Sequence, residues 1–466
     1  MHRTSRDSAG TVLFVVSASL FLLPFMLSAV AVALPSIGRS LDASALQVGL
    51  VETLYILSVA VFLLPLGRFG DIHGRRRVFV WGIFLFTLAT ALIALSPTIE
   101  ILIALRLFQG VGSAMVNATS LAIVVSVFPA AIRGRVLGIA ISTVYAGVAS
   151  GPLLGGLLTS YLGWRSVFLF GAALGLAAWL LTLWKLRGEW QEAAGESFDW
   201  GGSLIYGVSV SAVTLGASRL DSGVPALLLL VAGLAGLVLF VAVERRSPYP
   251  VLNIRLLTDN RLFALSNLAA FLNYASTFGV VFFLGLYMQY VRGMTPRDAG
   301  MLLMVQPLVQ MLLAPLGGRL ADRYPAARVA TAGMTLCCGG LLLASRIRQD
   351  APMTLVVATL LLLGLGYAFF STPNSSIVMG SVEKRYLGVA SGLTGAMRSL
   401  GMTLSMVTVT LIFSLFMGNQ SISPATIPAF MRSMHYNMLL FCGFSVVGIG
   451  CSIGRLLPSV QRSKRL

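Results

Sequence analysis

Three charged residues interrupt long apolar stretches of the chain: Glu52, Arg106 and Arg398. Charges are costly inside a lipid bilayer, and those that occur there commonly mark ion or substrate pathways. A carboxylate facing an arginine can bind or release a proton as its surroundings change. Glu52 and Arg106 each lie one to two helical turns from the same side of the predicted bilayer, so the two can meet. We predict a proton-linked pair; the alternatives are a fixed tie between helices and a Glu52 side chain that only reaches the membrane surface.

Small and polar residues form stripes near these charges. Arg106 is followed at helical spacing by Gly110, Ser113 and Asn117. Arg398 shares a predicted helix face with Ser391, Thr394 and Ser405, and two glutamines lie one turn apart elsewhere. We predict that these faces line a cavity for a small molecule, whereas the alternative is hydrogen bonding between helices. The predicted cavity residues are Gln109, Ser113, Asn117, Gln306, Gln310 and Arg398.

The composition places the helices that carry these residues in a membrane. Hydrophobic residues make up 57% of the 466 positions, charged residues only 11%, and the mean hydropathy is +0.89. This excludes a cytosolic enzyme and a disordered regulator. A helix needs about 20 apolar residues to cross a bilayer. Fourteen stretches meet this need: 11–34, 48–66, 78–96, 99–128, 135–160, 165–184, 201–217, 224–243, 262–290, 299–318, 329–346, 352–374, 386–416 and 435–456.

The net charge of +17 does not indicate nucleic-acid binding, because the basic residues lie in short clusters between the apolar stretches. With fourteen spans, 23 Lys and Arg residues fall on the side of the N-terminus and eight on the other side. Basic loops stay in the cytoplasm, so both termini are predicted to be cytoplasmic. The stretch 11–34 is longer than the apolar core of a signal peptide, and we expect it to be a retained span.

The chain contains a weak internal repeat. GRFGDIHGRRRV begins at Gly67 and GRLADRYPAARV begins at Gly318, while RVLG at Arg135 is repeated as RYLG at Arg385. The two offsets are 251 and 250 residues, which indicates a parallel duplication. We therefore predict a six-helix half (1–184), linkers with two inserted helices (185–261) and a second six-helix half (262–466).

One face of the fifth predicted span is built of glycines. Gly147, Gly151 and Gly155 recur every four residues around Pro152. Glycines allow close helix packing, and proline removes a backbone hydrogen bond. We predict a bendable gate at the interface between the two halves; the alternative is ordinary small-residue packing.

Three of these segments carry a family resemblance. GRFGDIHGRRR (67–77) resembles the signature loop of the major facilitator superfamily, RLFQGVGSA (106–114) resembles its fourth-helix motif, and GVASGPLLGG (147–156) resembles its antiporter motif. With fourteen spans, the chain resembles the drug:proton antiporter branch. The first helix departs from that branch, because Met26 and Ser28 stand before Ala33-Leu34-Pro35 where an Asp and a Thr are usual.

The resemblance implies an all-α integral membrane protein of the major facilitator fold, in which Asp71 helps to latch the cytoplasmic side. Asp322 matches Asp71 in the second copy, where Pro325 replaces Gly74 and a weaker latch is expected. The predicted gating residues are Gly67, Asp71, Arg75, Gly147, Gly151, Pro152, Gly155 and Asp322.

The function implied is secondary export of hydrophobic or amphiphilic small molecules, by proton antiport across the cell membrane. The alternatives are export of one metabolite or lipid, and a membrane sensor that does not transport. No catalytic cluster and no GxxxxGK[ST] nucleotide loop occurs, so neither an enzyme nor an ATP-driven pump is expected. The scattered histidines and the four cysteines in apolar runs predict no metal and no cofactor. The expected partners are a small-molecule substrate, protons and the lipid bilayer, with no nucleic acid, and the chain is expected to be a monomer.

Overall fold

The computed structural model describes residues 6–43, 45–218, 223–294, 296–417 and 424–456. Every regular element in these ranges is helical, which confirms the predicted all-α class. In hydrocarbon a helix satisfies its backbone hydrogen bonds within itself, so apolar stretches of this length fold as helices. The first six long helices are α1 (Arg6–Ser40), α2 (Ala45–His73), α3 (Arg75–Ala94), α4 (Ile99–Val127), α5 (Arg133–Leu162) and α6 (Arg165–Lys185).

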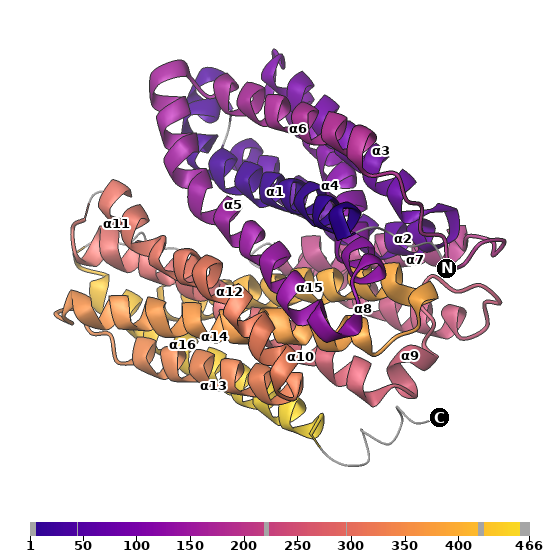
Figure 1. Ribbon diagram of the computed structural model, residues 1–466. Helices are drawn as coiled ribbons and strands as arrows, with labels where there is room; N and C mark the ends of the chain where they lie inside the picture. Colours follow the sequence, from indigo (N-terminus) through magenta and orange to yellow (C-terminus); the bar gives the residue numbers. More distant parts are fainter. Residues whose placement is uncertain (1–5, 44, 219–222, 295, 418–423, 457–466) are drawn as a thin grey trace. The chain divides into compact units, whose positions relative to one another are not determined.

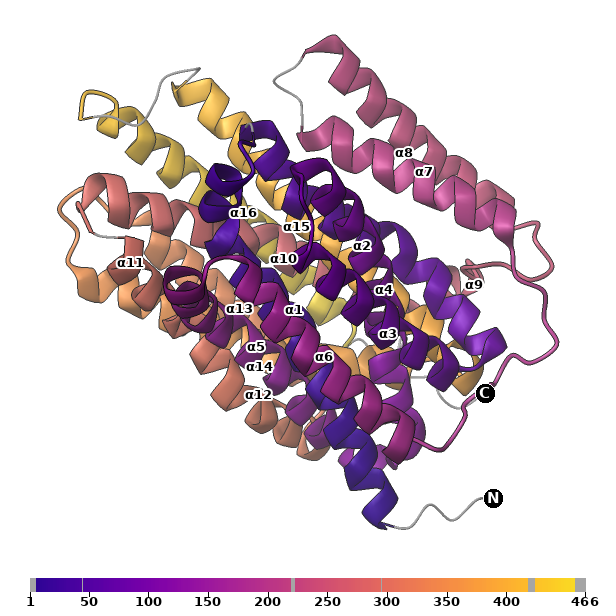
Figure 2. The same ribbon diagram turned by 90° about the horizontal axis from the view of Figure 1, so that it is seen from above.

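The inserted pair consists of α7 (Trp200–Ser218) and α8 (Val224–Glu244), which lie side by side (Figures 1 and 2). Small residues allow this close packing, because a Cβ atom built on Gly233 would lie 2.6 Å from the backbone nitrogen of Val213. The remaining helices are α9 (Arg255–Thr258), α10 (Arg261–Leu286), α11 (Pro296–Leu303), α12 (Val305–Arg323), α13 (Ala326–Ser345), α14 (Met353–Gly380), α15 (Leu387–Met417) and α16 (Ile427–Gly454). Short turns of helix occur at Ala130–Ile132, Tyr287–Val291 and Lys384–Tyr386.

Thirteen helices in the described ranges are long and apolar enough to cross a membrane, against fourteen predicted spans. The difference is α7, in which four glycines and four serines lower the hydropathy. The tenth predicted span, 299–318, is broken near Met304 into α11 and α12. The last span was predicted to begin at 435, but α16 begins at Ile427. Both termini lie outside the described residues, so their cytoplasmic placement stays a prediction.

The chain forms two compact units. The first comprises Met1–Gly207, Phe240–Ile254 and Val382–Ala396; within it α1 packs on α5, α2 on α4, and α3 on α4 and α6 (Figure 1). The second comprises Val208–Leu239, Arg255–Ser381 and Met397–Leu466; within it α13 packs on α14 and α16, and α12 on α14. These units are defined by packing and do not test the predicted duplication.

A buried arginine ties three helices of the second unit together. Arg455, which follows α16, is 1% exposed; its Nη1 donates to Ser266 Oγ on α10 at 3.1 Å and to Asn374 Oδ1 on α14 at 2.6 Å. Burial lowers the pKa of Arg455 to about 10. The guanidinium therefore stays charged at neutral pH, where these oxygens replace part of its lost hydration.

Candidate functional site

The predicted pair Glu52 and Arg106 lies where α2 packs on α4. The two side chains attract each other electrostatically, but they are not among the ion pairs found within 4.0 Å in the described residues. Glu52 Oε1 and Arg106 Nη2 are both buried and have no hydrogen-bond partner among those residues. The structure thus brings the two together without a fixed tie.

Arg106 is instead held by neutral groups. Its Nε donates to the Val51 carbonyl at 3.0 Å, and its Nη1 donates to Gln109 Oε1 at 2.5 Å. The guanidinium carbon lies 4.3 Å from the centre of the Tyr55 ring, a cation–π geometry. Gln109 Nε2 donates to Thr90 Oγ1 on α3 at 2.6 Å, so a chain of hydrogen bonds joins α2, α4 and α3.

Gln109 and Ser113, two of the predicted cavity residues, are buried between helices. Gln109 is 0% exposed and Ser113 is 1% exposed, and Ser113 Oγ accepts a hydrogen bond from Tyr55 at 2.9 Å. Asn117 is half-buried, donates to the Ser113 carbonyl and accepts from Ser391 Oγ at 3.2 Å through its own carbonyl. The bonds from Tyr55 and Ser391 are of the interhelical kind, and a cavity role for the stripe stays a prediction. Sequence reasoning missed Tyr55, although its position one turn after Glu52 was a usable signal.

The glycine face of α5 packs on α1 within the first unit. A Cβ atom on Gly151 would lie 2.9 Å from the Ala29 backbone nitrogen, and one on Gly155 would lie 2.7 Å from the Ala29 Cα atom. A Cβ on Gly147 would overlap the Phe21 carbonyl. α5 stays continuous through Pro152. A gating role for this face stays a prediction.

The segment 67–77 was predicted to be a loop, but it is helical on both sides of one residue. α2 continues to His73, α3 begins at Arg75, and only Gly74, with φ of +110°, lies between them. Asp71 and Arg75 are both 0% exposed and form an ion pair, with Arg75 Nε at 2.8 Å from Asp71 Oδ1. The negative charge of Asp71 is therefore fully buried.

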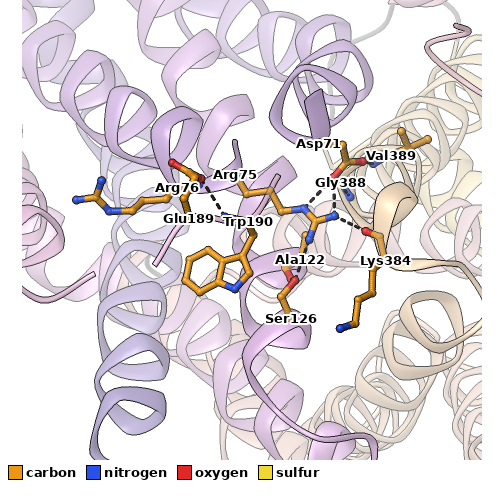
Figure 3. Close-up of polar contacts among 10 residues, drawn as sticks. All are labelled: Asp71, Arg75, Arg76, Ala122, Ser126, Glu189, Trp190, Lys384, Gly388 and Val389. Atoms are coloured by element: carbon orange, nitrogen blue, oxygen red, sulfur yellow. Dashed lines mark hydrogen bonds and ion pairs between the residues drawn. The ribbon is translucent and has the colours of Figure 1, made fainter. Parts of the chain in front are cut away.

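Asp71 binds the start of α15 (Figure 3). The backbone nitrogen of Gly388 donates to Oδ1 at 2.9 Å, and that of Val389 donates to Oδ2 at 3.1 Å. A helix N-terminus carries unpaired N–H groups and a partial positive charge, which favour a carboxylate. Arg75 also reaches across, donating to Ser126 Oγ at 2.8 Å and to the Lys384 carbonyl. We call Asp71, Arg75, Gly388 and Val389 the Asp71 cluster.

Gly67 makes this approach possible. A Cβ atom on Gly67 would overlap the Gly388 carbonyl, and one on Gly388 would lie 2.6 Å from Asp71 Oδ1. By contrast, Asp322 at the matching place of the second copy is exposed. The junction there is built differently, because Pro325 precedes α13 where the first copy has Gly74.

Three predicted cavity residues lie in the second unit. Gln306 and Gln310 on α12 are 6% and 5% exposed, and Gln306 Oε1 has no hydrogen-bond partner among the described residues. Arg398 on α15 is half-buried, and no hydrogen bond or ion pair of its side chain is found within the described ranges.

Sequence reasoning missed a further polar group in the second unit. Asn273 on α10 is 0% exposed, and neither polar atom of its side chain has a partner among the described residues. One turn along, Thr277 Oγ1 shares a hydrogen bond of 2.5 Å with the hydroxyl of Tyr367 on α14, whose ring lies 5.6 Å from that of Tyr274. A buried amide without partners is costly and is commonly satisfied by water or a ligand. A lone Asn in an apolar stretch was the available signal.

No group of three or more His, Cys, Asp or Glu residues in the described part of the chain could hold a metal ion. Cys338 and Cys442 place their sulfur atoms 3.4 Å apart, both as free thiols. The position of the usual first-helix carboxylate is also closed: Met26 is 1% exposed, and a Cβ atom on Gly171 of α6 would overlap its sulfur.

Comparison with known proteins identifies the fold. The chain is 29% identical over 410 residues to the "Riboflavin transporter RibZ" of Clostridioides difficile, covering 87% of each chain. It is 33% identical over 378 residues to the "Multidrug resistance protein Stp" of Mycobacterium tuberculosis, covering 80% of this chain and 70% of that protein. The crystal structure of the human organic anion transporter MFSD10 (TETRAN) matches 95% of this chain and 99% of that one, with a TM-score of 0.70 at 14% identity.

The family assignment rests on the sequence. The model of the Major Facilitator Superfamily matches residues 16–406, which include most of α1, all of α2 to α14 and most of α15. The chain therefore belongs to the Major Facilitator Superfamily and is a multi-pass membrane transporter of small molecules, not an enzyme.

Proposed function

We propose that this transporter exports hydrophobic or amphiphilic small molecules through the plasma membrane in exchange for protons, with both termini in the cytoplasm. The similarity to the multidrug resistance protein Stp supports export of drug-like compounds. The excess of basic residues on one side supports the orientation.

One observation carries the proton coupling: Glu52 Oε1 and Arg106 Nη2 are buried, attract each other, and lack hydrogen-bond partners among the described residues. A deprotonated Glu52 attracts Arg106, whereas a protonated Glu52 does not. Proton occupancy therefore changes the attraction between α2 and α4, which carry the two residues. Arg106 remains anchored in either state by the Val51 carbonyl and by Gln109.

Glu52 takes over the role of the usual first-helix carboxylate in this proposal. Met26 stands at that position and cannot carry a proton, and its side chain is packed against α6. A substrate that strengthens the attraction between Glu52 and Arg106 would favour the deprotonated carboxylate and release the proton in exchange, which is the coupling that antiport requires.

The second unit supplies the polar contacts for the substrate in this proposal. The unpaired atoms of Asn273 and Gln306 can bind a donor or an acceptor on a mainly apolar molecule. The half-buried Arg398 would attract an anionic group. Asp71 and its cluster act as the latch on the cytoplasmic side, which opens and closes during the cycle.

A second candidate is transport of one planar metabolite, which the similarity to the riboflavin transporter RibZ favours. The two candidates differ in substrate range: an exporter of drug-like compounds moves several unrelated amphiphiles, whereas a metabolite transporter moves one. Testing riboflavin beside several unrelated amphiphilic dyes separates them.

The experiment is flux in proteoliposomes under an imposed pH gradient, with wild type, Glu52→Gln and Glu100→Gln. Glu100 is the matched control, because it lies on the same helix as Arg106 but is exposed and bonded to Gln47. Gradient-driven flux that is lost in Glu52→Gln and retained in Glu100→Gln supports the proposal. If the Glu52→Gln variant still transports in response to the pH gradient, the proton site lies elsewhere. If no compound is transported by any variant, export is contradicted.

A further inference from the structure

The linker between α6 and α7, residues 186–199, is bound along the junction of α2 and α3. We call this segment the strap. It belongs to the same compact unit as the Asp71 cluster, and Figure 3 shows two of its residues, Glu189 and Trp190, beside Arg75 and Arg76. It leads from α6 into the inserted helical pair.

The strap satisfies backbone groups that the junction leaves without helical partners. A helix end lacks acceptors for its first N–H groups and donors for its last carbonyls. At the end of α2, the Asp71 carbonyl accepts from the Ala193 nitrogen at 3.0 Å, and the Ile72 carbonyl accepts from Gln191 Nε2 at 2.6 Å. The strap therefore caps the last turn of α2.

The first turn of α3 is capped from the same segment. The Arg75 nitrogen donates to the Trp190 carbonyl at 3.0 Å, and the Arg76 nitrogen donates to Glu189 Oε1 at 2.9 Å. A Cβ atom on Gly74 would lie 2.7 Å from the Glu189 carboxyl carbon, so the strap is pressed against the glycine between the two helices. These four bonds fix both sides of the turn that carries Asp71 and Arg75.

Charge holds the strap in place as well. Glu196 forms an ion pair with Arg68, whose side chain is 3% exposed, and Glu189 lies 3.8 Å from Arg77. The Glu196–Arg68 pair is partly buried and is therefore screened less by salt than an exposed pair. The Phe198 ring packs edge-on against Phe69 of α2, with 5.4 Å between ring centres.

Asp71 thus has partners on two sides. Its carbonyl binds the strap, and its carboxylate binds the start of α15. The second copy of the motif offers an internal comparison: Arg328 and Val329 bond to the Pro325 carbonyl beside them, and Asp322 is exposed. The buried carboxylate is therefore the one whose junction is bound by the strap.

The strap also leads directly into the inserted pair. Asp199, its last residue, accepts from the Gly202 nitrogen at 2.7 Å and from Ser247 Oγ at 2.8 Å, and Ser247 follows α8. One residue therefore joins the end of the strap, the start of α7 and the end of α8.

We propose that the strap is a positioning element of transport: it aims Asp71 at the N-terminus of α15, so that the inserted helical pair controls how readily the latch opens. This inference rests on the proposed latch function of the Asp71 cluster. Loosening the strap should raise the fraction of time that the latch is open without removing any residue of the latch itself.

The test uses a buried reporter in the full-length protein. Val389 is 1% exposed and contributes its backbone N–H to the latch, so Val389→Cys places a thiol there without removing that bond. Labelling by a membrane-impermeant maleimide is measured in inside-out vesicles, with the chain lacking the reporter as background. In this reporter background we compare Glu196→Gln and Glu189→Gln with Glu192→Gln, a matched control whose side chain is exposed and has no bond within the described residues.

We expect labelling to rise about tenfold in Glu196→Gln and Glu189→Gln and to stay at the parent rate in Glu192→Gln. Asp71→Asn serves as the positive control. If Asp71→Asn raises labelling and the two strap variants do not, the strap inference is wrong and the latch stands. If Asp71→Asn leaves labelling unchanged, the latch and the inference both fail.

A charge exchange separates positioning from a general loss of folding. Arg68→Glu should raise labelling, and the double variant Arg68→Glu with Glu196→Arg should return it towards the parent rate, because the ion pair is rebuilt with its signs reversed. A double variant that labels as fast as Arg68→Glu alone would contradict positioning by this pair.

Discussion

Asp71→Asn should open the latch by a large and calculable factor. Asp71 accepts hydrogen bonds from Arg75, Gly388 and Val389 through its two carboxylate oxygens. The amide of Asn has one oxygen, so its NH₂ group must face a backbone N–H of α15 or the guanidinium of Arg75, and at least one donor loses its acceptor. The substitution also removes the negative charge beside the buried Arg75.

The magnitude follows from the bonds that Asp71 makes to α15. The ion pair with Arg75 lies within the junction of α2 and α3, so opening the latch does not require breaking it. The Gly388 and Val389 nitrogens each bond one carboxylate oxygen, so Asn, with one oxygen, loses one of these bonds. A hydrogen bond to a charged group contributes about 1.5–3 kcal/mol. One factor of ten in an equilibrium corresponds to about 1.4 kcal/mol, so the open fraction should rise by roughly 10- to 100-fold.

The assay is maleimide labelling of Val389→Cys, together with gradient-driven flux in proteoliposomes. Flux should fall while the amount of folded protein, measured by size-exclusion chromatography in detergent, stays near that of wild type. The matched comparison is Asp322→Asn, because Asp322 occupies the same place in the repeated motif but is exposed. Equal labelling in Asp71→Asn and wild type, or equal effects of both Asn variants, would refute the reasoning.

Three further predictions concern glycines and one buried amide. Gly74→Ala should lower the melting temperature more than Gly163→Ala. Both glycines have positive φ, but only at Gly74 would the new Cβ atom meet the strap. Equal decreases in melting temperature would show that the strap moves away from the new Cβ atom at no cost. Gly151→Leu should abolish folded protein because the side chain would overlap α1. Gly156→Leu should be tolerated, because only one atom lies within 4 Å of a Cβ atom built there. The yield of detergent-solubilised protein distinguishes the two variants. Asn273→Leu should leave the melting temperature unchanged or higher, because the amide has no hydrogen-bond partner among the described residues. The same variant should lower flux, and unaltered flux would exclude Asn273 from substrate contact.

Sequence patterns were sufficient for the membrane architecture. Hydropathy depends on composition over about 20 residues, so it predicts the helices well, including α7. It did not predict the break near Met304 or the start of α16 at Ile427. The motif around Asp71 was also recognisable, because its residue types recur at Gly318. These features depend on residues that are close together in the chain, so they can be recognised from the sequence alone.

Partners across helices could not be predicted in the same way. Helical spacing gave Gln109 and Ser113 one face, but that face has neighbours on α2 and α3 and is closed by Tyr55 and Thr90. Likewise the α5 glycines indicated close packing without indicating that α1 is the partner. A periodic pattern shows which face of a helix carries the polar or small residues, but it does not show which helix packs against that face.

The sequence by itself therefore determined that this is a membrane transporter of the Major Facilitator Superfamily, because apolar length, basic loops and short motifs each act over a few residues. Only the tertiary structure decided that Asp71 is buried against the start of α15 and that its carbonyl is bound by Ala193. These contacts join residues separated by more than 100 positions, and their existence depends on backbone groups whose partners the fold alone supplies.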